Sequence, residues 1–131
     1  MATFPITTFY ALPLAIIFLA LFMNVTMSRS KLNQSIGDGG HVELHERIRK
    51  HGNFVEWVPM VMILMVLAEA NGTGSLWLHA AGLLLTIGRI LHPLGLRANV
   101  ATHPLRIAGN MGGILATVIL VISLARRVFG L

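Results

Sequence analysis

Long apolar stretches separated by short polar ones dominate the pattern of this chain. The first stretch carries no charge, and the four run over about residues 4–27, 43–70, 75–94 and 104–126. At 1.5 Å of rise per residue, a helix over each stretch is long enough to cross the hydrocarbon core of a bilayer, about 30 Å thick. Short connections favour antiparallel neighbours. The pattern therefore predicts an all-α membrane protein, an up-down bundle of four transmembrane helices that forms one domain over residues 1–131.

Turn signals mark the boundaries of these predicted helices. Residues 28–42 form the one polar stretch of any length and predict a mobile hairpin loop. Asn71 to Gly74 (Asn-Gly-Thr-Gly) reads as a tight turn. Pro104 stands where a helix favours proline, at its first position, and so predicts the start of the fourth helix.

Composition narrows the class of protein further. Of the 131 residues 55% are hydrophobic and 11% are charged, against about 25% charged in soluble domains. A net charge of +5 could indicate nucleic acid, but the basic residues lie near the ends of apolar segments, which argues against that partner. The chain has no cysteine and therefore no thiol nucleophile of its own. His41, His45 and Glu46 read as a solvated face rather than a metal site, so we expect no metal.

The distribution of basic residues predicts the orientation in the membrane. Most lie on the side of the loops after the first and third stretches: Arg29, Lys31, Arg47, Arg49, Lys50, Arg97 and Arg106. The other side has an uncharged turn together with Arg126 and Arg127. By the positive-inside rule, both termini should face away from the cytoplasm.

Polar residues interrupt the start of the second apolar stretch. Arg49, Asn53 and Glu56 are spaced i, i+4 and i+7, so they share one face of a helix. Charges near or inside a bilayer are costly and usually face a bundle interior with a function. This face therefore predicts a binding surface for a small charged molecule.

Further cations lie on the third and fourth stretches. Arg106 stands about three positions into the fourth, where the helix dipole is already positive, so it suggests an anion site; a snorkelling arginine that contacts lipid phosphate is the alternative. Arg89 and His92 share a face. A buried Arg89 needs a partner, for which Glu56 is the candidate, either at a binding site or as a structural ion pair. His92 could instead cap its helix.

Three arginines, one carboxylate and an asparagine suit a ligand with at least two negative groups and one positive group. Glutathione fits, because it carries two carboxylates, an ammonium, amides and a thiol whose thiolate an arginine would favour. Spacing alone does not distinguish glutathione from other small anions.

Three motifs together resemble the MAPEG superfamily, membrane-associated proteins in eicosanoid and glutathione metabolism. They are Arg49-Lys-His-Gly-Asn53-Phe-Val-Glu56 followed by an apolar run with Pro59, then Gly88-Arg89-Ile-Leu-His92, then Pro104-Leu-Arg106. The resemblance covers about residues 4–127, and the compact loops look like the bacterial branch. It implies a left-handed four-helix bundle that assembles as a homotrimer in a bacterial inner membrane.

The resemblance also implies a function. Glutathione would be the co-substrate of a transferase or peroxidase and would lie between subunits near the cytosolic face, with an apolar electrophile as the second substrate. Carried over by position, its ligands are Arg49, Asn53, Glu56, Arg89 and His92, with Arg29 contributed by the adjacent subunit. Arg106 matches the arginine that stabilises the thiolate. Gly52, Leu96 and Asn110 depart from eukaryotic members and argue against prostaglandin or leukotriene synthesis.

Two other functions stay open. One is a non-catalytic lipid-binding or scaffold protein of the same fold, which would be expected to lack Arg106. The other is a small transporter, which would need ionisable residues deep in the helices, yet Glu69 stands isolated. Gly109-Asn-Met-Gly-Gly113 is a GxxxG pattern that could pack helices either within one chain or between subunits.

Overall fold

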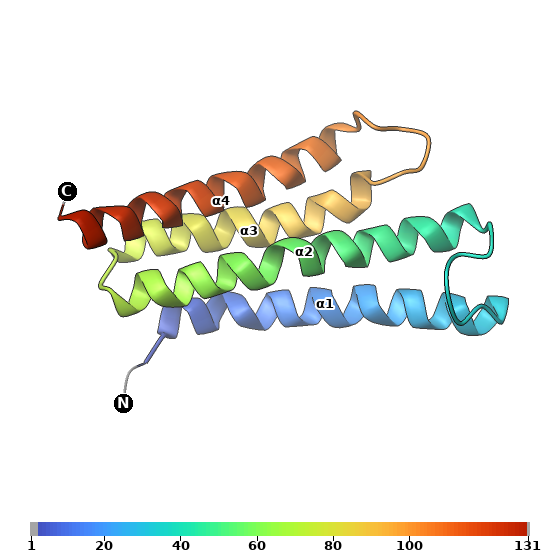
Figure 1. The fold of residues 1–131 in the computed structure, drawn as a ribbon, viewed down its shortest axis with the longest axis horizontal. Coiled ribbons are helices and arrows are strands. Elements are labelled where there is room, and N and C mark those ends of the chain that lie inside the picture. The colour runs from blue at the N-terminus through green and yellow to red at the C-terminus, as the bar shows by residue number, and fades with distance from the viewer. Residues whose placement is uncertain (1–2, 131) are drawn as a thin grey trace.

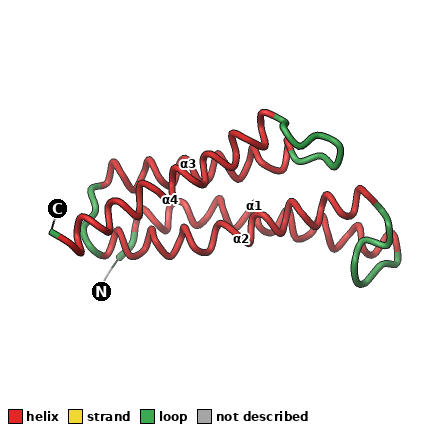
Figure 2. Tube along the Cα trace, turned by 45° about the horizontal axis from the view of Figure 1, so that its top comes forward, coloured by secondary structure: helices red, strands yellow, loops and turns green. Residues whose placement is uncertain are grey.

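The computed structural model describes residues 3–130 and is all-α, as predicted. Its four helices are α1 (Pro5–Leu32), α2 (Val42–Ala70), α3 (Ser75–Gly95) and α4 (Pro104–Phe129). They lie side by side, and each runs antiparallel to the one before it (Figure 1). The loops after α1 and α3 lie at one end of the bundle, whereas the α2–α3 turn and both chain ends lie at the other (Figures 1 and 2).

Three of these helices, α1, α2 and α4, are long and apolar enough to cross a membrane. The prediction of four helices is confirmed, whereas a membrane-spanning role for α3, which carries His79, Arg89 and His92, stays a prediction. Arg89 and His92 are buried, so they face protein rather than lipid. Because α2 and α4 run in the same direction, the chain between them must return along the bundle, and α3 provides that return (Figure 1).

The first helix is longer than its apolar stretch. We expected a loop from residue 28, but α1 continues to Leu32. Arg29 and Lys31 lie in its last turn, where cations interact favourably with the negative end of the helix dipole. Asn33 ends the helix in the left-handed region, with φ of 50°, and its backbone N–H bonds back to the last turn. The loop proper is therefore short.

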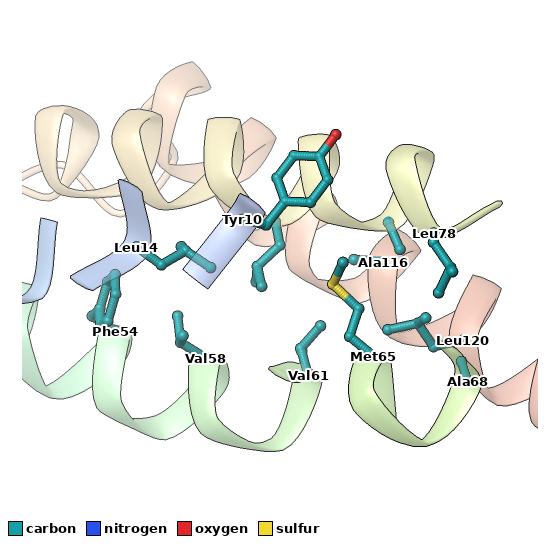
Figure 3. Packing of buried hydrophobic residues seen from close by; sticks show 12 residues of the cluster. Tyr10, Leu14, Phe54, Val58, Val61, Met65, Ala68, Leu78, Ala116 and Leu120 are labelled. Atoms are coloured by element: carbon teal, nitrogen blue, oxygen red, sulfur yellow. The ribbon is translucent and has the colours of Figure 1, made fainter. Parts of the chain in front are cut away.

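A single apolar core lies inside the bundle (Figure 3). All four helices contribute to it: Tyr10 and Leu14; Phe54, Val58, Val61, Met65 and Ala68; Leu78, Ala81 and Leu85; Ala116 and Leu120. On α2 and α3 these residues lie toward the α2–α3 turn. The opposite half of the bundle, near the two loops, is left to the polar residues of α2, α3 and the start of α4.

Glycines bring α3 and α4 into backbone contact. A Cβ atom on Gly109 would lie 2.7 Å from the carbonyl oxygen of Gly88, and one on Gly112 would lie 2.6 Å from that of Leu84. Both distances are too short for real side chains, so only glycine allows this approach. Gly113 faces Arg89 of the same chain. The structure therefore gives the GxxxG pattern an intrachain packing role.

At the far end of the bundle, Glu69 ties α2 to the start of α1. Its carboxylate accepts hydrogen bonds from the backbone N–H groups of Ile6 and Thr7, at 2.9 and 2.8 Å, and from the Thr7 hydroxyl at 2.6 Å. The first N–H groups of a helix have no partner within it, so this carboxylate caps α1 from another helix. The position of Glu69 in the sequence suggested that it was isolated, but in the fold it has these three hydrogen bonds.

Candidate functional site

An ion pair lies on the outer surface of α2 near the polar end. Arg49 Nη1 and Nη2 lie 3.2 and 3.4 Å from the Glu56 oxygens, and the two side chains are 47% and 54% exposed. Gly52 lies beneath them: a Cβ there would stand 3.4 Å from Arg49 Nη1. A side chain at residue 52 would therefore touch the Arg49 guanidinium at an ordinary contact distance.

Arg89 links three helices from inside the bundle. Its side chain is buried, Nη1 donates to Asn53 Oδ1 at 2.6 Å, and Nη2 donates to the carbonyl oxygen of Gly109 at 2.7 Å. The guanidinium carbon lies 5.8 Å from the centre of the Trp57 ring, within cation–π range. A Cβ on Gly113 would lie 3.2 Å from Arg89 Nη2, so that glycine provides the space the guanidinium needs.

These contacts correct one expected pairing. Glu56 does not bind Arg89; it binds Arg49 at the surface, whereas Arg89 extends inward to an amide and a backbone carbonyl. The Asn53 amide and the Gly109 carbonyl accept from the two terminal nitrogens of the buried guanidinium, and neither acceptor is charged. Arg89 Nε is buried and has no hydrogen-bond partner among the described residues.

His92 is buried where α3 packs on α4. It is 2% exposed, and its Cβ would stand 2.7 Å from a Cβ on Gly109, so it packs directly on α4. Arg106 stands three residues before Gly109 on α4, and Arg89 stands three residues before His92 on α3, so the packing of His92 on Gly109 brings the motifs of α3 and α4 together.

Arg106 occupies the first turn of α4 and is partly buried. The end of α3 packs against this turn: a Cβ on Gly95 would stand 2.3 Å from the Arg106 backbone nitrogen. Its Nη1 donates to the carbonyl of Ala101 at 3.3 Å, and in residues 3–130 it forms no salt bridge. The Nδ1 atom of His103 caps the helix by accepting from Leu105 N at 3.3 Å. Arg106 therefore retains guanidinium donors for a ligand.

Arg29 lies apart from these residues in its hydrogen bonding. Its Nη1 donates to the backbone carbonyls of Gln34, Ser35 and Gly37 at 3.2, 3.2 and 2.8 Å, which holds the α1–α2 loop against the end of α1. Among the described residues, Arg29 has no hydrogen bond to the other predicted site residues.

His45 and Glu46, which the sequence predicts to be part of a solvated face, each bind a partner outside α2. His45 Nδ1 lies 2.6 Å from Asp38 Oδ2, and Glu46 Oε1 accepts from Ala98 N at 2.7 Å. Glu46 thereby ties α2 to the α3–α4 loop. Neither contact involves His41.

Three cavities of about 510, 310 and 250 Å³ lie in the described chain. The second is polar and lies at the loop end, lined by residues that include Asn24, Arg47 and Arg97. None of the three is lined by Arg49, Glu56, Arg89 or Arg106. In one chain, Arg49 and Glu56 lie at the surface, whereas Arg89 and His92 are buried inside the bundle.

Sequence reasoning missed two residues that shape this site, Trp57 and Gly113. Trp57 is four residues after Asn53, the spacing that places it on the same helix face, so its spacing gave a usable signal. Gly113 gave none, because its role depends on where the Arg89 guanidinium ends in space.

Comparison with known proteins identifies the family of the chain. The model of the MAPEG family matches residues 7–126. The chain is 34% identical over 90 residues to a protein named inner membrane protein YecN in Escherichia coli strain K12, and equally to the one in strain CFT073, with 69% of each chain covered. No solved structure gives a significant match. The family match extends over all four helices, and the chain is therefore a membrane protein of the MAPEG family.

Proposed function

We propose that this protein is a membrane-bound glutathione transferase, or a related peroxidase, that uses the glutathione thiolate against apolar electrophiles. The observation that carries the proposal is Arg106: a partly buried guanidinium at the start of α4, with no salt bridge in the described chain, three residues before Gly109, on which His92 packs. Its charge and the positive end of the helix dipole both favour an anion at this place.

The other residues would hold the tripeptide. Arg49 and Glu56 form an exposed, opposite-charge pair that suits the carboxylates and ammonium of glutathione. Asn53, Arg89 and His92 form the floor, where Arg89 acts through the Asn53 amide that it orients. In the conjugation step, a carbon–sulfur bond forms to the electrophile, its leaving group departs with the bonding electrons, and the thiol proton passes to solvent.

A homotrimer would complete the site. Arg49 and Glu56 are about half exposed on a helix apolar enough to span the bilayer, where uncovered charges are costly. A neighbouring subunit would cover them and would bring its own Arg29. The basic residues at the loop end support a bacterial inner membrane location with both termini outside the cytoplasm. A reporter that is active only in the cytoplasm should be inactive when it is fused to the C-terminus, and activity of this fusion would contradict the orientation.

The direct test is thiolate formation in detergent-purified protein mixed with glutathione, followed by ultraviolet absorbance. We expect a thiolate signal in the wild type and its loss in Arg106→Ala, with helix content and oligomer size unchanged. Arg97→Ala is the matched control, since it removes an exposed arginine of the neighbouring loop and should keep the signal. An equal signal in wild type and Arg106→Ala would rule out the catalytic role of Arg106.

A non-catalytic lipid-binding or scaffold protein is the second candidate. It is favoured by the structural use of Arg89, which is hydrogen-bonded within the chain, and by the absence of the site residues from the three cavities. This alternative predicts no thiolate signal in any variant, together with measurable binding of a fatty acid or phospholipid.

A further inference from the structure

The largest of the three cavities lies at the end of the bundle opposite the candidate site. It measures about 510 Å³, within the range of small-molecule sites, and lies between the α2–α3 turn, the start of α3 and the end of α4. Its lining includes Thr73, Trp77, Ile119, Ile122, Arg126 and Arg127. No residue of the glutathione site contributes to it.

The polar end of this cavity is positively charged. Arg127 Nη2 donates to the carbonyl of Gly72, which anchors α4 to the turn, whereas Arg126 forms no ion pair and no side-chain hydrogen bond within residues 3–130. No carboxylate stands among the lining residues. The end of the α4 dipole favours cations here, but it leaves the Arg126 donors uncommitted.

Two neutral groups add to this preference for an anion. The N-terminus of α3 has Gly74 as its N-cap and no side-chain cap, and Gly74 and Trp77 line the cavity, so the partial positive charge of this helix end lies beside it. The Thr73 hydroxyl oxygen is buried and has no hydrogen-bond partner in the described chain, although Thr73 lines the cavity. A buried polar group without a partner is costly, and rotation of the Thr73 side chain toward the cavity would let its hydroxyl bond a ligand oxygen.

The remainder of the cavity wall is apolar and continues along a membrane-spanning helix. Ile119 and Ile122 lie on α4, which is apolar enough to span the bilayer, and Trp77 is 52% exposed beside the turn. Tryptophan is enriched where the hydrocarbon core meets the headgroups. The cavity therefore combines an anion-binding end with a wall suited to an acyl chain.

We infer that this cavity binds one anionic phospholipid of the surrounding bilayer. Its phosphate contacts Arg126 and the Thr73 hydroxyl beside the positive end of α3, and an acyl chain lies along Ile119, Ile122 and Trp77. The apolar wall selects a lipid over a free anion, and the guanidinium charge selects an anionic headgroup over a zwitterionic one. The bound lipid joins α3 to α4 at the end of the bundle away from the glutathione site.

Native mass spectrometry of the full-length protein in a neutral detergent tests this site. The probes are phosphatidylglycerol and phosphatidylcholine with the same acyl chains, and inorganic phosphate as a competitor. We expect phosphatidylglycerol to bind more tightly by about fivefold, as for one arginine near a charged membrane surface. Arg126→Gln should remove this preference, and Thr73→Val should reduce it without a change of charge. Arg97→Gln, an exposed arginine at the opposite end, should retain it.

Three outcomes would overturn the assignment. Equal binding of the two lipids would leave the charge without a role, and equal losses in Arg126→Gln and Arg97→Gln would reflect net charge alone. Displacement of the lipid by inorganic phosphate at matched concentration would identify a free-anion site. Circular dichroism and the melting temperature of each variant separate loss of the site from loss of the fold. Because Thr73 and Arg126 lie at the end of the bundle opposite Arg106, thiolate formation should be unaffected in Arg126→Gln and Thr73→Val.

Discussion

The Nη1 atom of Arg89 on α3 donates to Oδ1 of Asn53 on α2 across 2.6 Å, inside the bundle. A second donor of the same guanidinium bonds a backbone carbonyl of α4, at Gly109. Two residues that the motifs assign to ligand binding are therefore bonded to each other. Arg89 contributes to the site by fixing the positions of α2 and α4, and Asn53 meets a ligand only with the part of its amide that Arg89 leaves free.

Asn53→Ala should lower the stability of the bundle, because it removes the acceptor of a buried, charged donor. We expect a loss of about 1–3 kcal/mol, the usual cost when a buried charged group loses a hydrogen bond. Thermal unfolding in detergent measures it, with Asn24→Ala as the control because Asn24 is exposed. If Asn53→Ala and Arg89→Met together cost as much as the sum of the two alone, the bond carries no coupling energy.

Gly109→Ala should destabilise the contact of α3 with α4. The added Cβ would stand 2.7 Å from the Gly88 carbonyl oxygen, and backbone atoms cannot move as a flexible side chain can. Overpacking of this kind costs about 1–3 kcal/mol. Unfolding in detergent provides the measurement, and Met111→Ala serves as the control because Met111 is 45% exposed on the same helix. An unchanged melting temperature for Gly109→Ala would mean that the helices separate easily.

Glu69→Ala should loosen the start of α1, because three hydrogen bonds of the cap end on this one carboxylate. The loss of a helix cap costs about 1–2 kcal/mol. Hydrogen exchange of the peptide that contains Ile6 and Thr7 measures the effect locally. Glu69→Gln, which keeps one oxygen acceptor, should exchange at an intermediate rate. Glu43→Gln changes an exposed carboxylate at the other end of α2 and should leave the exchange of this peptide unaltered.

The helices and the family could be predicted from the sequence because each rests on a repeated local signal. The apolar stretches identified the four helices, and Pro104 identified the first residue of α4. The end of α1 could not be read from apolarity, because the polar residues up to Leu32 remain helical with a capping Asn33. Composition also did not show that the Arg89 and His92 side chains of α3 would be buried inside the bundle.

The pairing of the site residues depended on distances that no spacing along the chain contains. Helical periodicity placed Arg49, Asn53 and Glu56 near one another, but it could not say that Arg49 would take Glu56 or that Arg89 would reach Asn53. For Arg89, Gly113 matters, because its missing side chain leaves the space that the guanidinium occupies toward α4. The trimer and its bound glutathione stay predictions.

Acid should open the α1–α2 loop, because Asp38 closes it. Asp38 Oδ1 accepts from the Gly40 N–H at 2.9 Å, and Oδ2 lies 2.6 Å from His45. The Gly40 hydrogen bond, followed by the bond to His45, holds the pKa of the Asp38 carboxyl below its ordinary value of 3.8. A carboxyl whose pKa is lowered by folding contributes stability above its unfolded pKa, and this contribution is lost as the pH falls through the lower folded value.

Limited proteolysis of the loop with an acid-active protease should therefore accelerate in that range. Asp38→Asn should be cleaved rapidly already above pH 3.8, with little further change on acidification. A wild type and an Asp38→Asn variant with the same pH profile would show that this carboxylate does not hold the loop.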